Sequence, residues 1–416
     1  MVDFFSSVRS RFSFRWWKKT SRIRYYWYGV ENSCFLWLDV LLLLAGIPSA
    51  STSKWPHERT IRYISTCLFV LQSMLYVQQT INAIADRKEN MPIFLLEVVK
   101  TTSIALISLK LLLMIHLRKP LDSVRSFINS DRVRSGDDAY DELVYGKFNR
   151  SGRRMIRVIF GLIGLEAVLM TFPCSTTRRV FRLPRQLMGA GKNVASLVNF
   201  LYLGLLPVGM CPRFFTNLTS LGILLMGMRA KLKILAHRYQ RMLAQSPLEE
   251  TQYYKFMVLE VREIMDQQLE FSRHLKILKQ MVGKAFSLVH YFSIYAIGTM
   301  FYVSKIMGLN TTAIMLVAST AWLLLEYYLW CQLVDSLKDE AESFGLNILE
   351  ICCVMPFKRK YASYYIQLRT SLMISWISMR NGLSMNCLGL FEISTAAFVA
   401  LLNIVYTVVT FLLNIN

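Results

Sequence analysis

The most constraining feature of the sequence is the apolar stretch near its carboxyl-terminal end, residues 388–413, in which Glu392 is the only charged residue. A helix rises about 1.5 Å per residue, so the part from Ile393 to Leu413 is about long enough to cross a hydrocarbon core of about 30 Å. The sequence therefore predicts a membrane-spanning helix here, and the faces of that helix are where its role should be sought.

One face of this predicted helix is polar. Asn403, Thr407, Thr410 and Asn414 are spaced four, three and four residues apart, which places them in one stripe. Because polar groups in hydrocarbon are costly unless they are partnered, the stripe should face other helices or water. Two interpretations stay open. The stripe either makes helix–helix hydrogen bonds, or it lines a pore in which Phe411 is an apolar constriction and Asn414 a polar ring.

Composition places the chain among membrane proteins. Its 416 residues are 54% hydrophobic and the mean hydropathy is +0.36, which is typical of a polytopic membrane protein. The net charge of +21 would suggest a nucleic-acid partner in a soluble protein. Here the bases lie between apolar runs, so we expect membrane topology and anionic lipid to explain them, with no nucleic acid as a partner.

Seven stretches are predicted as spans, and one further apolar stretch is shorter. Residues 35–47 are too few to cross and are interrupted by Asp39, so we expect a re-entrant or interfacial segment, with a crossing as the alternative. The seven predicted spans are residues 61–85, 93–117, 155–173, 196–222, 285–307, 312–333 and 388–413.

The distribution of Lys and Arg between the spans predicts the orientation. The linkers after the second, fourth and sixth spans are basic, and these are residues 118–154, 223–284 and 334–387. The linker 174–195, with four arginines, is an exception. The positive-inside rule then places the amino terminus in the cytoplasm, and seven crossings place the carboxyl terminus outside the cell.

Helical periodicity continues past several spans into the predicted cytoplasmic linkers, over residues 221–245, 256–283, 335–350 and 361–380. Such helices would pack into an anchor below the membrane, either within one subunit or between subunits. The predicted fold is therefore all-α: a seven-transmembrane helical membrane protein with a cytoplasmic N-terminus, an extracellular C-terminus and cytoplasmic helical anchor extensions.

Four segments follow from these predictions. Residues 1–60 form a cytoplasmic amino-terminal segment that includes the short interfacial stretch, and residues 61–333 hold six transmembrane helices with their cytoplasmic extensions. Residues 334–387 form cytoplasmic anchor helices. Residues 388–416 form the last, pore-lining transmembrane helix.

The sequence contains no GxxxxGK[ST], HExxH or GxSxG motif and no CxxC pair. We therefore expect neither enzyme activity, nor a cofactor, nor a metal site. Charged residues within or beside the spans are more informative, because each of them needs a partner there. Structural ion pairs and an ion-coupled transporter are the two interpretations of these charges, which are Glu97, Lys100, Lys110, Glu166 and Glu326.

A small apolar ligand requires a concave, mostly apolar pocket with a few polar anchors. The outer halves of the second, third, fourth and sixth spans are the candidates for lining one, with ordinary helix packing as the alternative role of each residue. The candidate pocket residues are Thr101, Thr102, Ala105, Glu166, Leu169, Met170, Tyr202, Leu205, Met315, Ser319 and Trp322.

Several loose motifs run in order along the chain: Trp37-Leu38-Asp39, Lys119-Pro120-Leu121 after the second span, Lys233-Ile234-Leu235 in the extension of the fourth span, and Trp376 before the last span. Taken together, they make the chain similar to the insect seven-transmembrane odorant receptors. The chain departs from the family pattern at Phe344-Gly345, where a Cys-Gly pair is frequent.

The most specific match lies at the end of the chain. Phe391, Ser394, Phe398 and the run from Tyr406 to Leu412 resemble the family's F…S…[FY]-S-x-x-T-x-[LI] ending. A second departure is Asn414, which stands where the co-receptor of such receptors carries Gln. A role for this position in ion selectivity is therefore open.

The resemblance implies a ligand-gated, non-selective cation channel with four subunits around one pore, lined by the last span of each. It also implies that Phe411 occupies the gate and Asn414 the adjoining polar ring. The partner would be a shared co-receptor subunit, joined through the cytoplasmic anchor helices. Because the chain lacks the long cytoplasmic insertion of a co-receptor, the resemblance indicates an odorant-tuning subunit that detects a small volatile at the plasma membrane of olfactory neuron dendrites.

Three alternatives remain. A gustatory receptor shares the fold, but its ending usually carries Gln-Phe where this chain has Leu412-Leu413. A G-protein-coupled receptor requires an extracellular amino terminus, against which the Lys and Arg distribution argues. A transporter requires coupled charges at the midplane, for which Glu166 is the best candidate.

Overall fold

The computed structural model describes residues 33–48, 57–85, 91–171, 192–244, 250–308 and 311–414. Residues 1–32 of the predicted amino-terminal segment and most of the linker 174–195 lie outside these residues. The described chain is almost entirely helical, as expected. Its helices are α2 Cys34–Leu44, α3 Glu58–Ala85, α4 Met91–His116, α5 Arg118–Asn129, α6 Asp138–Thr171, α9 Lys192–Ala244, α10 Glu250–Met307, α11 Thr311–Val354, α12 Ala362–Gly382 and α13 Thr395–Asn414.

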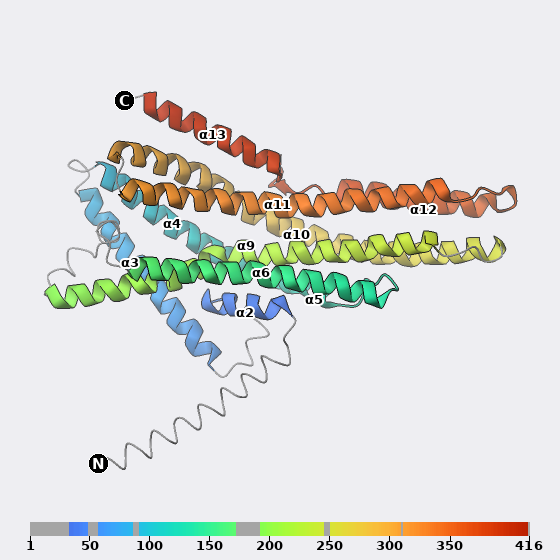
Figure 1. Ribbon diagram of the computed structural model, residues 1–416, viewed down its shortest axis with the longest axis horizontal. Helices are drawn as coiled ribbons and strands as arrows, with labels where there is room; N and C mark the ends of the chain where they lie inside the picture. Colours follow the sequence, from blue (N-terminus) through green and yellow to red (C-terminus); the bar gives the residue numbers. More distant parts are fainter. Residues whose placement is uncertain are drawn as a thin grey trace, which may run out of the picture.

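The predicted continuation of the spans into long helical extensions is confirmed for α9, α10 and α11. With 58 residues, α10 is about 87 Å long at about 1.5 Å per residue, far more than a hydrocarbon core of about 30 Å. The predicted segments 221–245, 256–283 and 335–350 all fall inside these long helices, and 361–380 falls on α12. Figure 1 shows the result, an elongated bundle in which α12 lies at one end and α3, α4 and α13 lie toward the other.

By length and composition, four helices of the described chain can cross a membrane, and they comprise Glu58–Ala85, Phe94–His116, Ser196–Met242 and Tyr253–Ile306. The helix Thr395–Phe411 is a shorter apolar one. The three other predicted spans, 155–173, 312–333 and 388–413, overlap α6, α11 and α13.

Polar contacts join the long helices at the α12 end. The hydroxyl of Tyr239 in α9 lies 3.2 Å from the hydroxyl of Ser375 in α12. The Gln268 side chain in α10 donates to the Ser375 carbonyl at 3.0 Å, and its own oxygen accepts from the Ser375 hydroxyl. All three side chains are buried. Because each of these three side chains has a partner, their hydrogen bonds hold α9, α10 and α12 in one register.

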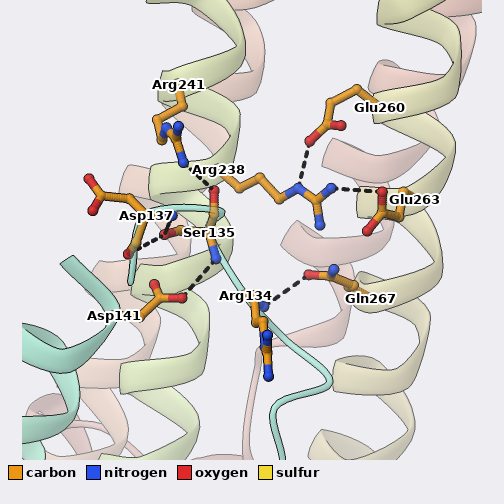
Figure 2. A network of polar contacts seen from close by, with 9 residues as sticks. All are labelled: Arg134, Ser135, Asp137, Asp141, Arg238, Arg241, Glu260, Glu263 and Gln267. Atoms are coloured by element: carbon orange, nitrogen blue, oxygen red, sulfur yellow. Dashed lines mark hydrogen bonds and ion pairs between the residues drawn. The ribbon is translucent and has the colours of Figure 1, made fainter. Parts of the chain in front are cut away.

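The segment between α5 and α6 binds across α9 and α10 (Figure 2). The Arg134 amide donates to Gln267 of α10 at 3.4 Å, and Arg241 of α9 donates to the Ser135 carbonyl at 3.3 Å. Gly136 has φ +78°, and a Cβ there would lie 2.9 Å from the Arg241 guanidinium. The left-handed backbone conformation therefore favours glycine at this turn, whereas the Arg241 side chain could shift to make room for a Cβ.

Ion pairs reinforce the same region. Arg238 of α9 lies 2.6 Å from Glu260 and 2.9 Å from Glu263, both in α10. At the start of α6, the Tyr140 amide donates to Asp137, which lowers the pKa of that carboxyl, and His237 of α9 adds a side-chain interaction in the same direction. These contacts fix the α5–α6 connection against the two long helices.

The short stretch predicted to be re-entrant or interfacial forms α2. This helix has 11 residues, about 16 Å, so it is too short to cross. It lies beside α6 in Figure 1. Asp39, which interrupts the apolar run, is fully buried. Its two carboxylate oxygens accept hydrogen bonds from the two terminal guanidinium nitrogens of Arg125 in α5, at 2.6 and 2.7 Å. A charge that looks misplaced in the sequence is one half of a buried bidentate pair.

The predicted start of the last span at residue 388 is wrong, because the helix begins at Thr395. Residues 386–392 form a small antiparallel hairpin, with Asn386 opposite Glu392. Leu388 and Gly389 have φ of 51° and 81°, a left-handed backbone that ends any helix at this point. An ideal Cβ on Gly283 of α10 would lie 2.8 Å from the Asn386 carbonyl, so the hairpin packs directly on α10 at a glycine.

We predict that Asp39→Ala lowers the free energy of unfolding by about 3 kcal/mol, because it removes the buried carboxylate that pairs with the Arg125 guanidinium, whose side chain is 14% exposed. The change should be visible as a lower apparent Tm of the detergent-solubilised protein. The matched control is Arg118→Ala, which breaks the Arg118–Asp122 pair, whose side chains are 44% and 47% exposed. Its expected cost is less than about 1 kcal/mol. Equal losses of Tm in the two variants would contradict the assignment.

Candidate functional site

The base of α13 is held by α11. The carboxylate of Asp335 in α11 accepts from the Thr395 amide at 2.7 Å and from the Thr395 hydroxyl. It therefore satisfies a free amide at the helix start, where a negative charge is favoured. Beside it, Lys338 donates to Glu392 at 3.0 Å, and this hydrogen bond raises the pKa of Lys338.

One face of α13 packs on the bundle. Leu401 and Val405, four residues apart, are buried. The ring of Phe398 lies 6.2 Å from that of Tyr327 and 5.5 Å from that of Tyr328, both in α11. A Cβ on Gly298 of α10 would contact Val408 at 3.3 Å. Figure 1 shows α13 set at an angle to α11.

The polar stripe lies outside that packed face. Asn403, Thr407 and Asn414 are exposed and Thr410 is half-buried. The Thr407 and Thr410 hydroxyls donate to the carbonyls of Asn403 and Tyr406, at 2.9 and 2.8 Å, so the helix itself satisfies them. Phe411 is 64% exposed. The stripe and the predicted gate residue are therefore available to groups outside this chain.

A buried ion pair joins α4 to α11. Lys110 Nζ lies 2.6 Å from Glu326 Oε1, and the two side chains are 0% and 2% exposed. The ammonium also lies 3.9 Å from the ring centroid of Phe214 in α9 and 3.4 Å from the Phe214 carbonyl. The interpretation of these two charges as a structural ion pair is thereby confirmed. Three helices meet at one satisfied charge pair.

Glu326, the α11 residue of this pair, lies close in sequence to Trp322 and Tyr327, which contact other helices. Trp322, a predicted pocket residue, precedes Glu326 by one turn of α11. The next residue, Tyr327, packs against Phe398 of α13. Glu326 therefore lies in a segment of α11 that contacts Phe215 of α9 through Trp322 and Phe398 of α13 through Tyr327.

A second polar cluster links α3, α4 and α9. Lys100 of α4 lies 2.6 Å from Glu97 and donates to Gln79 of α3 at 3.4 Å. Thr101, a predicted pocket residue, has its hydroxyl paired with that of Thr80 in α3. Tyr202 of α9, also a predicted pocket residue, has its ring 6.2 Å from that of Tyr76 in α3.

Sequence reasoning missed the contribution of α3 to this cluster. Its buried polar residues Gln72, Tyr76 and Gln79 are spaced four and three residues apart. That spacing is the same signal that identified the stripe of α13, and it predicts one polar face on an otherwise apolar span.

Other predicted pocket residues lie at different helix contacts. Glu166 of α6 accepts from the thiol of Cys211 in α9 at 3.0 Å. The ring of Trp322 lies 6.4 Å from that of Phe215 in α9. Met170 and Ser319 are half-buried, Ala105 and Leu205 are exposed, and the hydroxyl of Thr102 donates to its own helix at 2.8 Å. The side chains of Leu169 and Met315 lie outside the described part.

One cavity of about 440 Å³ lies between α3 and α4. Its lining includes the exposed residues Val70, Met74 and Val77, so it is open on one side. Ser108 is the lining residue that α4 supplies, and the described lining includes none of the predicted pocket residues.

Comparison with known proteins identifies the fold. No protein-family model and no curated protein matches the chain. Among solved structures, the insect olfactory receptor OR5 from Machilis hrabei superposes with a TM-score of 0.67 at 10% identity, over 91% of this chain and 97% of that one. The same receptor in complex with eugenol gives 0.69 at 12% identity, with the same coverage. The chain therefore has the helical membrane fold of an insect olfactory receptor.

We predict that Lys110→Met and Glu326→Leu each lower the free energy of unfolding by about 3–5 kcal/mol, because each leaves a charge unpaired in an apolar interior. The double variant should recover most of this loss, because apolar replacement of both partners is often neutral. The apparent Tm values of the parent, the two single variants and the double variant give the coupling energy between Lys110 and Glu326.

The exposed pair Lys338–Glu392, with side chains 41% and 40% exposed, serves as the control cycle. Its coupling energy should be below about 1 kcal/mol. Losses that simply add in the Lys110→Met and Glu326→Leu cycle would show that the two charges do not stabilise each other.

Proposed function

We propose that the chain is an odorant-tuning receptor subunit that forms an odorant-gated, non-selective cation channel with a shared co-receptor. The observation that carries the proposal is the division of α13 into two faces. Leu401 and Val405 pack on the bundle, whereas Asn403 and Thr407 are exposed on a helix apolar enough for lipid. The fold shared with an olfactory receptor over 91% of the chain supports it.

Exposed polar side chains on a membrane helix need partners that this chain does not supply. Copies of the same helix around a symmetry axis would bring the stripes together around water. Phe411 would then form an apolar constriction that opens and closes by wetting, and Asn414 a polar ring next to it. The non-selective conduction is consistent with a wall of hydroxyls and amides that carries no charge.

The anchor helix α12 offers a surface for subunit assembly. Ile366, Ile374 and Ile377 fall on one face of α12 and are 61%, 55% and 48% exposed. On the other face, Leu368 and Leu372 are buried against the bundle. An apolar stripe on a cytoplasmic helix is the kind of surface that a neighbouring subunit covers, here the co-receptor or a second copy of this chain.

The ligand would be a small volatile that enters between the outer halves of the spans. The polar contacts at Thr101, Tyr202 and Glu166 would supply the few anchors that such a pocket needs among apolar side chains. OR5 forms a complex with eugenol, which is a precedent for a small-molecule ligand on this fold. The proposed location is the plasma membrane of olfactory neuron dendrites.

The alternatives are weaker. In a gustatory receptor the tail would carry Gln-Phe at positions 412–413, where this chain has two leucines. A coupled transporter uses midplane charges that bind and release ions, whereas Lys110 and Glu326 neutralise each other in a closed, buried pair.

We predict that cells expressing this chain together with a co-receptor give inward cation currents to at least one member of a volatile panel, whereas cells expressing this chain alone do not. Phe411→Ala should raise the resting current, because it removes the apolar constriction. The matched control is Leu402→Ala, nine residues earlier on the opposite side of α13 and also exposed. Unchanged conductance and resting current in the Phe411 variant would overturn the gate assignment.

We also predict that Ile374→Asp abolishes assembly, because a charge would have to be buried in an apolar subunit contact. Co-purification with the co-receptor and size-exclusion profiles measure it. Leu143→Asp, at a leucine of α6 that is 51% exposed, is the control and should leave assembly intact. Normal complex formation by the Ile374 variant would rule out α12 as the subunit contact.

A further inference from the structure

The first half of α6 carries a basic stripe that no part of the proposed channel function uses. Lys147, Arg150, Arg154 and Arg157 are spaced three, four and three residues apart, so they lie on one face of the helix. All four are exposed. No acidic residue occurs between positions 143 and 165, so α6 itself does not neutralise the stripe.

The opposite face of α6 packs on the protein, so the stripe faces outward. Phe148, Gly152 and Ile156 are buried there. The ring of Phe148 lies 6.0 Å from that of Phe35 in α2, and a Cβ on Gly152 would lie 2.8 Å from the Cys34 side chain. Among the ion pairs of the residues that the structure describes, none involves the four bases of the stripe.

The same face continues as an apolar one. Val158, Leu165 and Val168 follow the bases at helical spacing and are 55%, 54% and 52% exposed. The change from base to apolar residue occurs between Arg157 and Val158, within a single turn. Such a sharp change on an exposed helix face marks the level at which lipid tails end and headgroups begin. The basic stripe therefore starts at the headgroup layer.

The length of the stripe indicates the kind of lipid. From Arg157 to Lys147 is about 15 Å along the helix at about 1.5 Å per residue. A headgroup layer is only about 5–7 Å thick per leaflet. The bases farthest from the apolar face therefore extend beyond the phosphates of ordinary phospholipids, to the level where phosphates on a projecting headgroup would lie.

We propose that Lys147, Arg150, Arg154 and Arg157 form a binding surface for an anionic phospholipid of the adjacent leaflet whose headgroup carries more than one phosphate, such as a phosphorylated inositol lipid. Arg binds phosphate with paired donors, and Lys adds a mobile charge at the far end of the stripe.

The test uses the full-length protein purified in detergent and titrated with short-chain lipids, with bound lipid counted by native mass spectrometry. The arms are phosphatidylcholine, phosphatidylserine, phosphatidylinositol bisphosphate and soluble inositol trisphosphate. The variant replaces all four bases of the stripe by Gln. The control replaces four exposed bases far from the apolar face by Gln: Lys255, Arg262, Lys276 and Arg369.

We expect phosphatidylinositol bisphosphate to bind most tightly and the stripe variant to bind it at least tenfold more weakly, since each base near a membrane surface contributes about fivefold. The control variant should bind as the parent does. Raising the salt concentration should weaken binding to the parent, because the contacts are electrostatic. If the fourfold variant is poorly folded, two double variants, the half-stripe variants, replace it: Lys147→Gln with Arg150→Gln, and Arg154→Gln with Arg157→Gln. Each is compared with a charge-conserving double variant at the same positions, in which Lys is replaced by Arg and Arg by Lys. The charge-conserving variants should retain lipid binding.

Three results would overturn the proposal. The stripe variant, or both half-stripe variants, could bind the lipid as tightly as the parent. The control variant could lose as much binding as the stripe variant. Soluble inositol trisphosphate could bind as tightly as the lipid, which would assign the stripe to a free phosphate instead. None of these measurements depends on ion conduction, so the lipid site and the channel can fail independently.

Discussion

The satisfaction of polar groups inside an apolar bundle is the constraint on which the rest of the structure depends. Lys110 and Glu326 are paired at 2.6 Å with almost no exposure, and Asp39 holds Arg125 through two hydrogen bonds. Each pair fixes helices that are distant in sequence, because an unpaired charge at either site would be strongly destabilising. The exposed polar stripe of α13 is the contrasting case, since the bundle leaves it open.

That contrast separates stability from function within one chain. The helices α4, α9 and α11 close around a satisfied charge pair, and α11 then positions α13 through Asp335 and the aromatic contacts of Phe398. The last helix is therefore well anchored at its base and free along one face. In the proposed channel, a helix held in this way would present the same surface to neighbouring subunits while the packed helices behind it respond to a ligand.

Much of the fold follows from local patterns in the sequence. The long helices were predictable because periodicity and apolar runs are local properties, as with residues 256–283 in α10. The hairpin before α13 was not predicted, because Leu388, Gly389 and Leu390 continue the apolar pattern of the following helix. Their backbone nevertheless forms a turn between two short antiparallel strands. Local hydropathy indicates whether a segment lies in an apolar environment, but it does not indicate whether the backbone there is a helix or a turn.

The candidate site was less predictable, because it depends on contacts between distant segments. Lys110 and Glu326 are 216 residues apart, and nothing in either local sequence names the other as its partner. The predicted pocket residues Thr101 and Tyr202 contact α3, a span that the pocket prediction did not include. Helix rotation decides such contacts, and a shift of one residue turns a side chain by about 100°.

The central claim is that the polar stripe of α13 faces water in an assembled channel. Cysteine accessibility tests it most directly: Asn403→Cys and Thr407→Cys receptors, co-expressed with the co-receptor, are treated with a membrane-impermeant charged thiosulfonate while current is recorded. Leu402→Cys is the control, because Leu402 is also exposed but points about 100–140° away from these two positions around the helix. The account predicts rapid, ligand-dependent block at the two stripe positions and none at the control, whereas modification at none of them, or only at Leu402→Cys, would contradict it.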